Sequence, residues 1–248
     1  MKNKTIGIIG GGFIGQVLKR AYPSATVYDI NGQFDKREDV VNKDIIFIAF
    51  NLKDNALSGT LQIEEYLDDM KPGAVVIIKS TFVPGTTDKL QDKYQGLNIV
   101  YNPEFLSEAT AWEDFTKPQF QILGMPNKTL ELAWEIFSYL PSAPVRRIIS
   151  PKDAETLKHA LNTYYALKVT WFNQLYDACG KLGCDYETIR EIMIKNPWVG
   201  ESHSVIMHKG YRGYGGKCLS KDPRHLGTMT QMPLIRTMEE YNETLRTL

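Results

Sequence analysis

Short apolar runs and helical patterns alternate along the first part of the chain. The apolar runs are nearly continuous, and such runs are typical of strands that are buried on both faces of a parallel sheet. Helical segments such as residues 61–70 separate several of these strands. The pattern predicts an α/β fold with a doubly wound parallel sheet. We expect its strands at residues 5–9, 25–29, 44–50, 74–79, 97–101, 119–123 and 145–149.

The pattern changes to a helical one after two prolines, at residues 141 and 151, that bracket the last expected strand. Residues 153–179 contain no proline or glycine, and their apolar spacing predicts a helix of roughly 40 Å. The apolar residues of this helix cover more than one of its faces, so we expect the helix to be buried on more than one side. We therefore expect a homodimer that forms across this helix. We also expect helices at residues 186–195 and from 226 to 248. The sequence therefore predicts two domains, at residues 1–150 and 151–248.

Charge and composition exclude several classes of partner. Lysine plus arginine and aspartate plus glutamate each number 29, and the basic residues are scattered. We therefore expect neither nucleic acid nor a membrane as a partner, and no apolar run is long enough to span a bilayer. The odd number of cysteines suits a reducing cytoplasm better than a disulfide framework. Neither the cysteines nor the histidines have metal-ligand spacing, so we expect no metal site.

A glycine-rich motif, GGGFIG at residues 10–15, directly follows the first expected strand and leads into a helical pattern. Gly10 would make the tight turn, Gly12 would let the backbone approach a pyrophosphate, and Gly15 would let the helix pack closely. Asp29 ends the second strand, where an acid is expected to bind the ribose 2′-hydroxyl. The motif predicts a Rossmann-type fold that binds NAD in preference to NADP. The alternative is a glycine-rich loop in another α/β protein.

Polar residues follow three neighbouring strands, at Asn51, at residues 79–81 and at residues 102–104. In open parallel sheets, ligands bind at the carboxyl ends of the strands. Asn102 followed by a proline predicts a helix start, with Glu104 and Glu108 one turn apart on one face. These acids could serve polar binding or base chemistry. Alternatively, they could simply favour a helix N-terminus.

A second glycine-rich stretch, GYRGYGGKCLSKD at residues 210–222, contains Cys218 close to Lys217 and Lys221. Cationic neighbours favour the thiolate form of a cysteine. Asp222 would share a helical face with Cys218 if a helix begins here. The alternative is a mobile surface loop that contains a thiol.

Lys158 and a nearby asparagine, Asn162, are one turn apart on the long predicted helix, so both could face the first domain. The alternative for this pair is a solvated lysine and an ordinary helical asparagine.

Five segments together resemble the UDP-glucose/GDP-mannose dehydrogenase family. They occur in the family's order and span most of the chain, and RGYGGKCLSKD is similar to the family's most specific signature. The segments are GGGFIG at residues 10–15, KSTFVPGTT at 79–87, YNPEFLSEATA at 101–111, ETLKHALNTYYALKVTWFNQL at 155–175 and RGYGGKCLSKD at 212–222.

The resemblance implies roles for individual residues. Cys218 would form the covalent thiohemiacetal and thioester, Lys158 and Asn162 would stabilise the oxyanion, and Asp222 with Glu108 would handle water or a proton. Thr81 would lie beside the nicotinamide. The implied cofactor residues are Gly10, Gly12, Phe13, Ile14, Asp29, Thr81 and Glu108. The implied substrate residues are Glu104, Phe105, Leu106, Glu108, Lys158, Asn162, Tyr211 and Gly215.

The resemblance implies an NAD-dependent, two-step oxidation of a nucleotide sugar, UDP-glucose to UDP-glucuronate, as in polysaccharide biosynthesis. GDP-mannose or a UDP-N-acetylhexosamine is the alternative substrate. A single-step hydroxyacid dehydrogenase and a shortened, non-catalytic NAD-binding paralogue are the alternatives of other classes.

The chain departs from the family's pattern at several positions. It stops at Leu248, where the family's carboxy-terminal UDP-binding domain would begin. We therefore expect a lower affinity for the nucleotide part of the substrate than in members with three domains. Trp198 stands where many members have an arginine, and Ser220 replaces the proline of the cysteine motif. Residues 51–53 and 119–120 also differ from the family's usual residues. These departures affect the expected substrate binding more than the expected chemistry.

Overall fold

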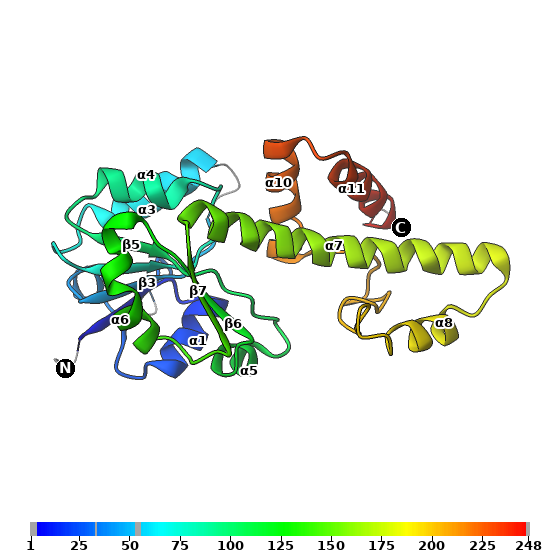
Figure 1. Cartoon of the computed structure of the whole chain (residues 1–248), viewed down its shortest axis with the longest axis horizontal. Coiled ribbons are helices and arrows are strands. Elements are labelled where there is room, and N and C mark those ends of the chain that lie inside the picture. Colours follow the sequence, from blue (N-terminus) through cyan, green and yellow to red (C-terminus); the bar gives the residue numbers. More distant parts are fainter. Residues whose placement is uncertain (1–3, 33, 53–55, 247–248) are drawn as a thin grey trace. The chain divides into compact units, whose positions relative to one another are not determined.

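The computed structural model describes residues 4–32, 34–52 and 56–246. The chain divides into two compact units, Met1–Lys158 and His159–Leu248 (Figure 1). The division falls inside the long helix α7 (Pro151–Leu182), and not ahead of it at residue 150. We describe each unit by itself.

The first unit is built on a seven-stranded sheet with the order β2-β1-β3-β4-β5-β6-β7. All neighbouring strands are parallel except β5 and β6, which meet in an antiparallel pair at Tyr101 and Gly124. The expectation of a wholly parallel sheet is therefore wrong at this one pair. An antiparallel neighbour needs no crossover, and the chain between β5 and β6 contains only the short helix α5. The strands are β1 (Ile6–Ile9), β2 (Thr26–Tyr28), β3 (Ile45–Ile48), β4 (Val75–Ile78), β5 (Asn98–Tyr101), β6 (Phe120–Gly124) and β7 (Val145–Ile149).

Helices cover both faces of this sheet (Figure 1). Along β3, Ile46 and Ile48 pack into the core with α2, α3 and α4. Ile45 and Phe47 pack into the other core, with α1, α5 and α6. Both faces of each central strand are therefore buried, which confirms the doubly wound fold and explains the continuous apolar runs. The helices are α1 (Phe13–Ala21), α2 (Arg37–Val41), α3 (Ala56–Leu67), α4 (Thr86–Lys93), α5 (Ala111–Thr116) and α6 (Ala133–Ser138), with a 3₁₀ turn at Asn127–Leu132.

Asn102 does not begin a helix, contrary to the prediction from Asn102 and Pro103. Residues 102–107 are irregular, and α5 begins at Ala111. The Asn102 side chain binds partners across the sheet: it accepts a hydrogen bond from Lys79 Nζ and donates to the carbonyl of Ile122. These long-range bonds occupy the side chain that would otherwise cap a helix.

The second unit begins within α7, which has 32 residues and is longer than predicted. The helix ends at Gly183, whose φ is 71°, and Cys184 N donates to Cys179 O at 2.9 Å, as in a Schellman motif. Asp185 then caps α8 (Tyr186–Met193) with its side chain. Three further helices follow: α9 (Gly216–Leu219), α10 (Asp222–Thr230) and α11 (Pro233–Arg246).

Large apolar side chains of α7 differ in their burial. Phe172 is buried in a core with Tyr186 and Ile206. Tyr164 and Trp171 are about half exposed in the chain as described. The second unit therefore leaves apolar surface on this helix in addition to the stripe that it buries.

Candidate active site

The first glycine loop has the backbone geometry of a phosphate-binding turn. Gly10 has a φ of 106°, and a Cβ there would lie 2.7 Å from the carbonyl oxygen of Ala49. A Cβ at Gly15 would lie 1.7 Å from the carbonyl oxygen of Gly10, so α1 can begin this close to the turn only with glycine. Apart from its two neighbours in the chain, no residue that the structure describes comes within 4 Å of a Cβ built on Gly12, which precedes α1. The open space before the helix fits a pyrophosphate.

Asp29 lies beside this turn, as the sequence predicts. Its Oδ2 accepts a hydrogen bond from Gly11 N at 2.7 Å, and its Oδ1 accepts from Asn31 N at 3.0 Å. Phe13 is exposed and Ile14 is partly buried in the first turn of α1. The loop, the helix start and the acid together fit a bound dinucleotide.

A buried polar cluster lies at the carboxyl ends of the central strands, where the sequence predicts ligand-facing residues. Lys79 is 6% exposed, and its Nζ donates to Asn102 Oδ1 at 2.5 Å. Burial lowers the pKa of Lys79 to about 8, although the nearby Glu104 carboxylate opposes this effect; the positive charge of Lys158 lowers the pKa further. Ser80 Oγ donates to the Phe50 carbonyl at 2.7 Å. Lys79 is thus a buried cation with limited charge compensation.

Lys158 and Glu104 form a buried ion pair in the first unit. Lys158 Nζ lies 2.9 Å from Glu104 Oε1 and also donates to the Glu104 carbonyl at 2.7 Å. Glu104 Oε2 accepts from Leu106 N, and Lys158 Nζ lies 5.6 Å from the centre of the Phe105 ring. The structure therefore brings together four predicted substrate residues, although three of them come from the segment that is not helical. Glu108 is an exposed residue of the following turn.

Glu155 is a buried acid that the sequence does not single out, and it lies three residues before Lys158 on α7. Its carboxylate is fully buried and accepts hydrogen bonds from Thr87 N at 2.8 Å, Thr87 Oγ1 at 2.6 Å and Gly85 N. Burial raises the pKa of this carboxyl, although its hydrogen bonds oppose the shift. These bonds attach α7 to the start of α4, which begins five residues after the partly buried Thr81. The sequence offers one indication of Glu155: it is an acid that lies one helical turn before Lys158.

The second unit contains a buried pair of the predicted catalytic residues. Asn162 Nδ2 donates to Asp222 Oδ2 at 2.5 Å, and both side chains are almost fully buried. The other carboxylate oxygen, Asp222 Oδ1, is buried and has no hydrogen-bond partner among the residues that the structure describes. A buried carboxylate oxygen without a partner is costly, so Asp222 Oδ1 is a candidate for binding a ligand or water.

Cys218 is an exposed residue of α9. This helix ends at Leu219, and α10 begins at Asp222. Cys218 and Asp222 therefore do not share one helix face, contrary to the prediction that depended on a continuous helix. The break allows the cysteine to be exposed while the aspartate, four residues later, is buried.

Lys158 and Asn162 lie one turn apart on α7, as predicted. Lys158 contacts Glu104 and the Phe105 ring within the first unit, and Asn162 binds Asp222 within the second. Tyr211 and Gly215, the two other predicted substrate residues, lie beside Arg246 at the end of α11.

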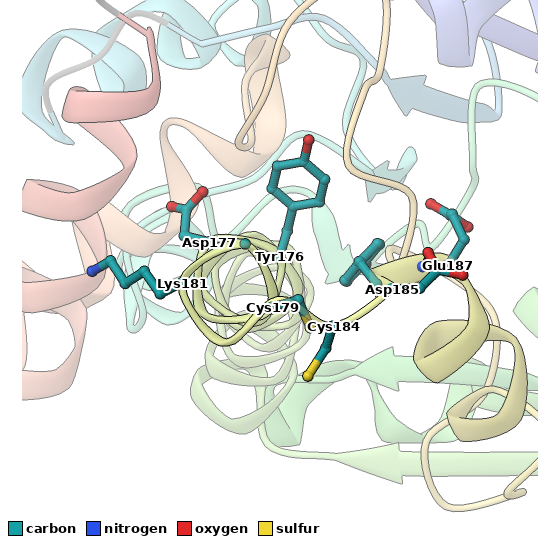
Figure 2. A pocket seen from close by; sticks show the side chains of 9 residues that line it. Tyr176, Asp177, Cys179, Lys181, Cys184, Asp185 and Glu187 are labelled. Atoms are coloured by element: carbon teal, nitrogen blue, oxygen red, sulfur yellow. Dashed lines mark hydrogen bonds between the residues drawn. The ribbon is translucent and has the colours of Figure 1, made fainter.

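A pocket of about 640 Å³ lies at the turn between α7 and α8 (Figure 2). Its lining includes Tyr176, Cys179, Cys184 and Glu187 and contains none of the predicted site residues. We therefore do not assign the chemistry to this pocket. Within residues 4–32, 34–52 and 56–246, no group of three His, Cys, Asp or Glu side chains could hold a metal ion. No helix in this part of the chain is long and apolar enough to cross a membrane.

Comparisons with known proteins show the family to which this chain is related. Residues 26–140 match the NAD binding domain of the UDP-glucose/GDP-mannose dehydrogenase family, and residues 152–244 match the central domain of that family. The UDP-glucose 6-dehydrogenase of Rhizobium meliloti is 26% identical over 235 residues, which are 88% of this chain and 51% of that protein. The chain thus spans about half the length of this relative.

Solved structures show the same fold. A UDP-glucose dehydrogenase from Pyrobaculum islandicum matches with a TM-score of 0.81 and 21% identity, over 97% of this chain and 68% of the other. A UDP-D-ManNAc dehydrogenase from Pyrococcus horikoshii has a TM-score of 0.82, with the same identity and the same coverage. Since two domain models of one family match most of the sequence, the chain belongs to the UDP-glucose/GDP-mannose dehydrogenase family, and its first unit contains the family's NAD-binding domain.

Proposed function

We propose that this chain oxidises the C6 alcohol of a nucleotide sugar to the carboxylate in two steps, with UDP-glucose as the substrate and UDP-glucuronate as the product. The buried Asn162–Asp222 pair carries this proposal. An amide that is held against a carboxylate with one oxygen unpartnered suits a site where an oxyanion forms and water is later activated. Cys218 lies exposed four residues before this aspartate.

The chain's own side chains account for the covalent part of the reaction. After the alcohol has lost a hydride and a proton, Cys218 Sγ adds to the aldehyde carbon and forms a thiohemiacetal. Loss of a second hydride from the carbon, together with the proton of the adduct's hydroxyl group, turns this adduct into a thioester. Water then breaks the carbon–sulfur bond, releasing the acid and returning the proton to the thiol. NAD bound at the glycine turn would supply the hydride acceptor, and two NAD molecules would be needed in succession, one for each hydride.

The other predicted catalytic residues would support these steps. Lys158 and Asn162 would stabilise the negative oxygen at each tetrahedral stage, since an ammonium and an amide N–H both donate to it. Asp222 would act as the general base that activates water, with Glu108 and Thr81 assisting. Lys158 binds Glu104 in the structure, so it must exchange this partner for the substrate oxygen.

A panel of nucleotide sugars tests the proposal directly. The purified chain, incubated with NAD and UDP-glucose, should release two NADH per sugar together with the acid. The names of similar proteins include GDP-mannose dehydrogenase and UDP-N-acetyl-mannosamine dehydrogenase, so these two sugars complete the panel. One NADH per substrate would indicate a single-step dehydrogenase. Absence of NADH with every sugar would indicate a non-catalytic NAD-binding protein and would refute the proposal.

Asp29→Ala should narrow the preference of the protein for NAD over NADP. The Asp29 carboxylate lies at the glycine turn, where it would repel the 2′-phosphate of NADP. We expect the ratio of Kd values for NADP and NAD to fall by roughly tenfold, which is the effect of losing one charged contact. Isothermal titration of both cofactors measures this ratio. Asn31→Ala, which removes a partner of Asp29 but keeps the charge, should retain the NAD preference. An unchanged ratio in Asp29→Ala would contradict the assignment.

We also propose a homodimer that covers the exposed apolar side of α7. Tyr164 and Trp171 lie half exposed on this helix, and their burial would stabilise a symmetric interface. Sedimentation at micromolar concentration should show a dimer, and Trp171→Glu should shift it towards the monomer. A control change at the exposed Lys181 near the end of the same helix, Lys181→Glu, should leave the dimer intact. A wild-type chain that sediments as a monomer would contradict this proposal.

A further inference from the structure

The loop that precedes the helix with Cys218, residues 211–215, is attached to α7 through Arg212. Arg212 Nη2 lies 2.7 Å from Asp177 Oδ1, and Arg212 Nε donates to Asn173 Oδ1 at 3.1 Å. The guanidinium also lies over the Tyr176 ring, 4.9 Å from its centre. Asn173 is fully buried, so the hydrogen bond from Arg212 attaches one side of the loop to the packed interior of the unit.

The other side of the loop is held by α11. Asn242 Oδ1 accepts a hydrogen bond from Tyr214 N at 2.8 Å, and Asn242 Nδ2 donates to Tyr214 O at 3.1 Å. One side-chain amide therefore satisfies both backbone polar groups of Tyr214, which has no strand partner in the loop. Arg246 Nη1 donates a longer bond, of 3.4 Å, to the same carbonyl.

Two glycines of the loop lie where side chains of α11 approach it closely, and the positive φ of one of them favours glycine. Gly213 has a φ of 77°, and a Cβ there would lie 2.4 Å from Asn242 Oδ1. A Cβ at Gly215 would lie 2.1 Å from Arg246 Nη1 and 2.9 Å from Tyr211 Oη. Both glycines thus make room for polar side chains of α11, in addition to any role towards a ligand.

Tyr241 links the two attachments. Its hydroxyl donates to Asp177 Oδ2 at 2.5 Å, while the other oxygen of Asp177 binds Arg212. Burial, together with the bond to Asp177, raises the pKa of Tyr241 to about 12, so the hydroxyl keeps its proton. Adjacent residues of α11, Tyr241 and Asn242, therefore contact both α7 and the loop.

We propose that Asn242 is a positioning residue for the reaction: by holding the backbone of Tyr214 it fixes the loop that carries Cys218. The inference rests on the proposed function, since it assumes that Cys218 is the nucleophile. An irregular loop loses conformational freedom when it is ordered, and the paired Asn242 amide offsets this cost. Fixed placement matters for rate, because misplacing a reacting group by about 1 Å can cost roughly 100-fold.

Asn242→Ala tests the inference with the full chain. We expect kcat with UDP-glucose and NAD to fall by roughly 10- to 100-fold. The Kd for NAD should stay unchanged, because the glycine turn at residues 10–15 belongs to the first unit. Hydrogen–deuterium exchange of the peptide that contains Tyr214 should become about tenfold faster, since its N–H loses its acceptor. Asn242→Asp keeps an oxygen for this N–H and should recover part of the kcat.

A matched control is Glu240→Ala on the same helix. Glu240 is exposed, its ion pair is with Arg236, and its replacement should leave kcat and loop exchange at wild-type values. A wild-type kcat in Asn242→Ala, with or without faster exchange, would overturn the inference. If the alanine variant does not fold, Asn242→Leu, which has a similar size but no amide, takes its place, and a wild-type kcat in that variant would overturn the inference.

The role of Asn242 can also be tested without any catalytic activity of the chain. If the wild-type chain makes no NADH from any nucleotide sugar, the proposed function fails, and the positioning of Cys218 is tested by alkylation instead. Iodoacetamide labels both Cys218 and the exposed Cys184, which serves as the internal reference. In Asn242→Ala, a change of about threefold or more in the Cys218 rate relative to Cys184 would support the inference. An unchanged ratio with unchanged exchange of the Tyr214 peptide would overturn it.

Discussion

Cys218→Ala should abolish net acid formation while NAD binding is retained. Removal of the sulfur leaves the first hydride transfer possible but removes the covalent attachment on which the second depends. We expect the steady-state rate of acid formation to fall by roughly 10³-fold or more, as when a covalent nucleophile is removed. The measurement is NADH and uronate released per UDP-glucose, together with the Kd for NAD.

The reverse reaction makes this test sharper. Supplied with the 6-aldehyde and NADH, the Cys218→Ala protein should still reduce the aldehyde to the alcohol, because this step needs no thioester. Cys184→Ala is the matched control, since Cys184 is an exposed cysteine of the same unit that lies outside the glycine-rich loop. Two NADH per sugar from Cys218→Ala would show that the loop cysteine is not the nucleophile, and the two-step mechanism would then need another attachment point.

Lys79→Met should change how the stability of the protein depends on pH. Burial lowers the pKa of Lys79 to about 8, whereas the unfolded chain has the ordinary value of 10.5. Below pH 8 both states carry the charge, and the folded protein bears the cost of burying it. Between pH 8 and 10.5 the unfolded state binds more protons than the folded state, so the free energy of unfolding rises with pH.

The wild type should therefore gain stability relative to Lys79→Met by about 3 kcal/mol as the pH rises from 8 to 10.5. Urea unfolding of both proteins at pH 7, 8, 9 and 10 measures the difference in their free energies of unfolding. The contributions of all other titrating groups, which the two proteins share, cancel in this difference. The lost bond to Asn102 adds a cost to the variant that does not depend on pH. Lys117→Met, at an exposed lysine, is the control and should show no such trend. A difference between wild type and Lys79→Met that stays constant across this range would contradict the burial of a charged Lys79.

The strands and the first glycine turn could be predicted from the sequence because their causes are local. Ile45 to Ile48 form an unbroken apolar run, since neighbouring residues of β3 enter the two cores on opposite faces of the sheet. Gly10 and Gly15 are required by contacts between the turn and its own helix and neighbouring strand. Asp29 could be predicted for the same reason, because it directly follows the second strand of the same strand–helix–strand segment.

The features that could not be predicted depend on contacts between distant residues. Asn102 has the sequence of a helix cap, but its bonds to Lys79 and Ile122 outweigh that local preference. Glu155 reads as an ordinary helical acid, and only folding brings its carboxylate to Thr87. Nothing local to Asn242 indicates that it binds Tyr214, 28 residues away.

The sequence by itself determined the α/β class, the order of the two domains and the nucleotide-binding turn, and it predicted most of the residues in the proposed site. Burial periodicity and glycine geometry are properties of consecutive residues, so they can be read without a structure. The tertiary structure alone decided which of these residues meet. It placed Asp222 against Asn162 and Lys158 against Glu104. It also separated Cys218 from Asp222 by a helix break, because the partners of a buried polar group are chosen by packing across the fold and not by its neighbours in sequence.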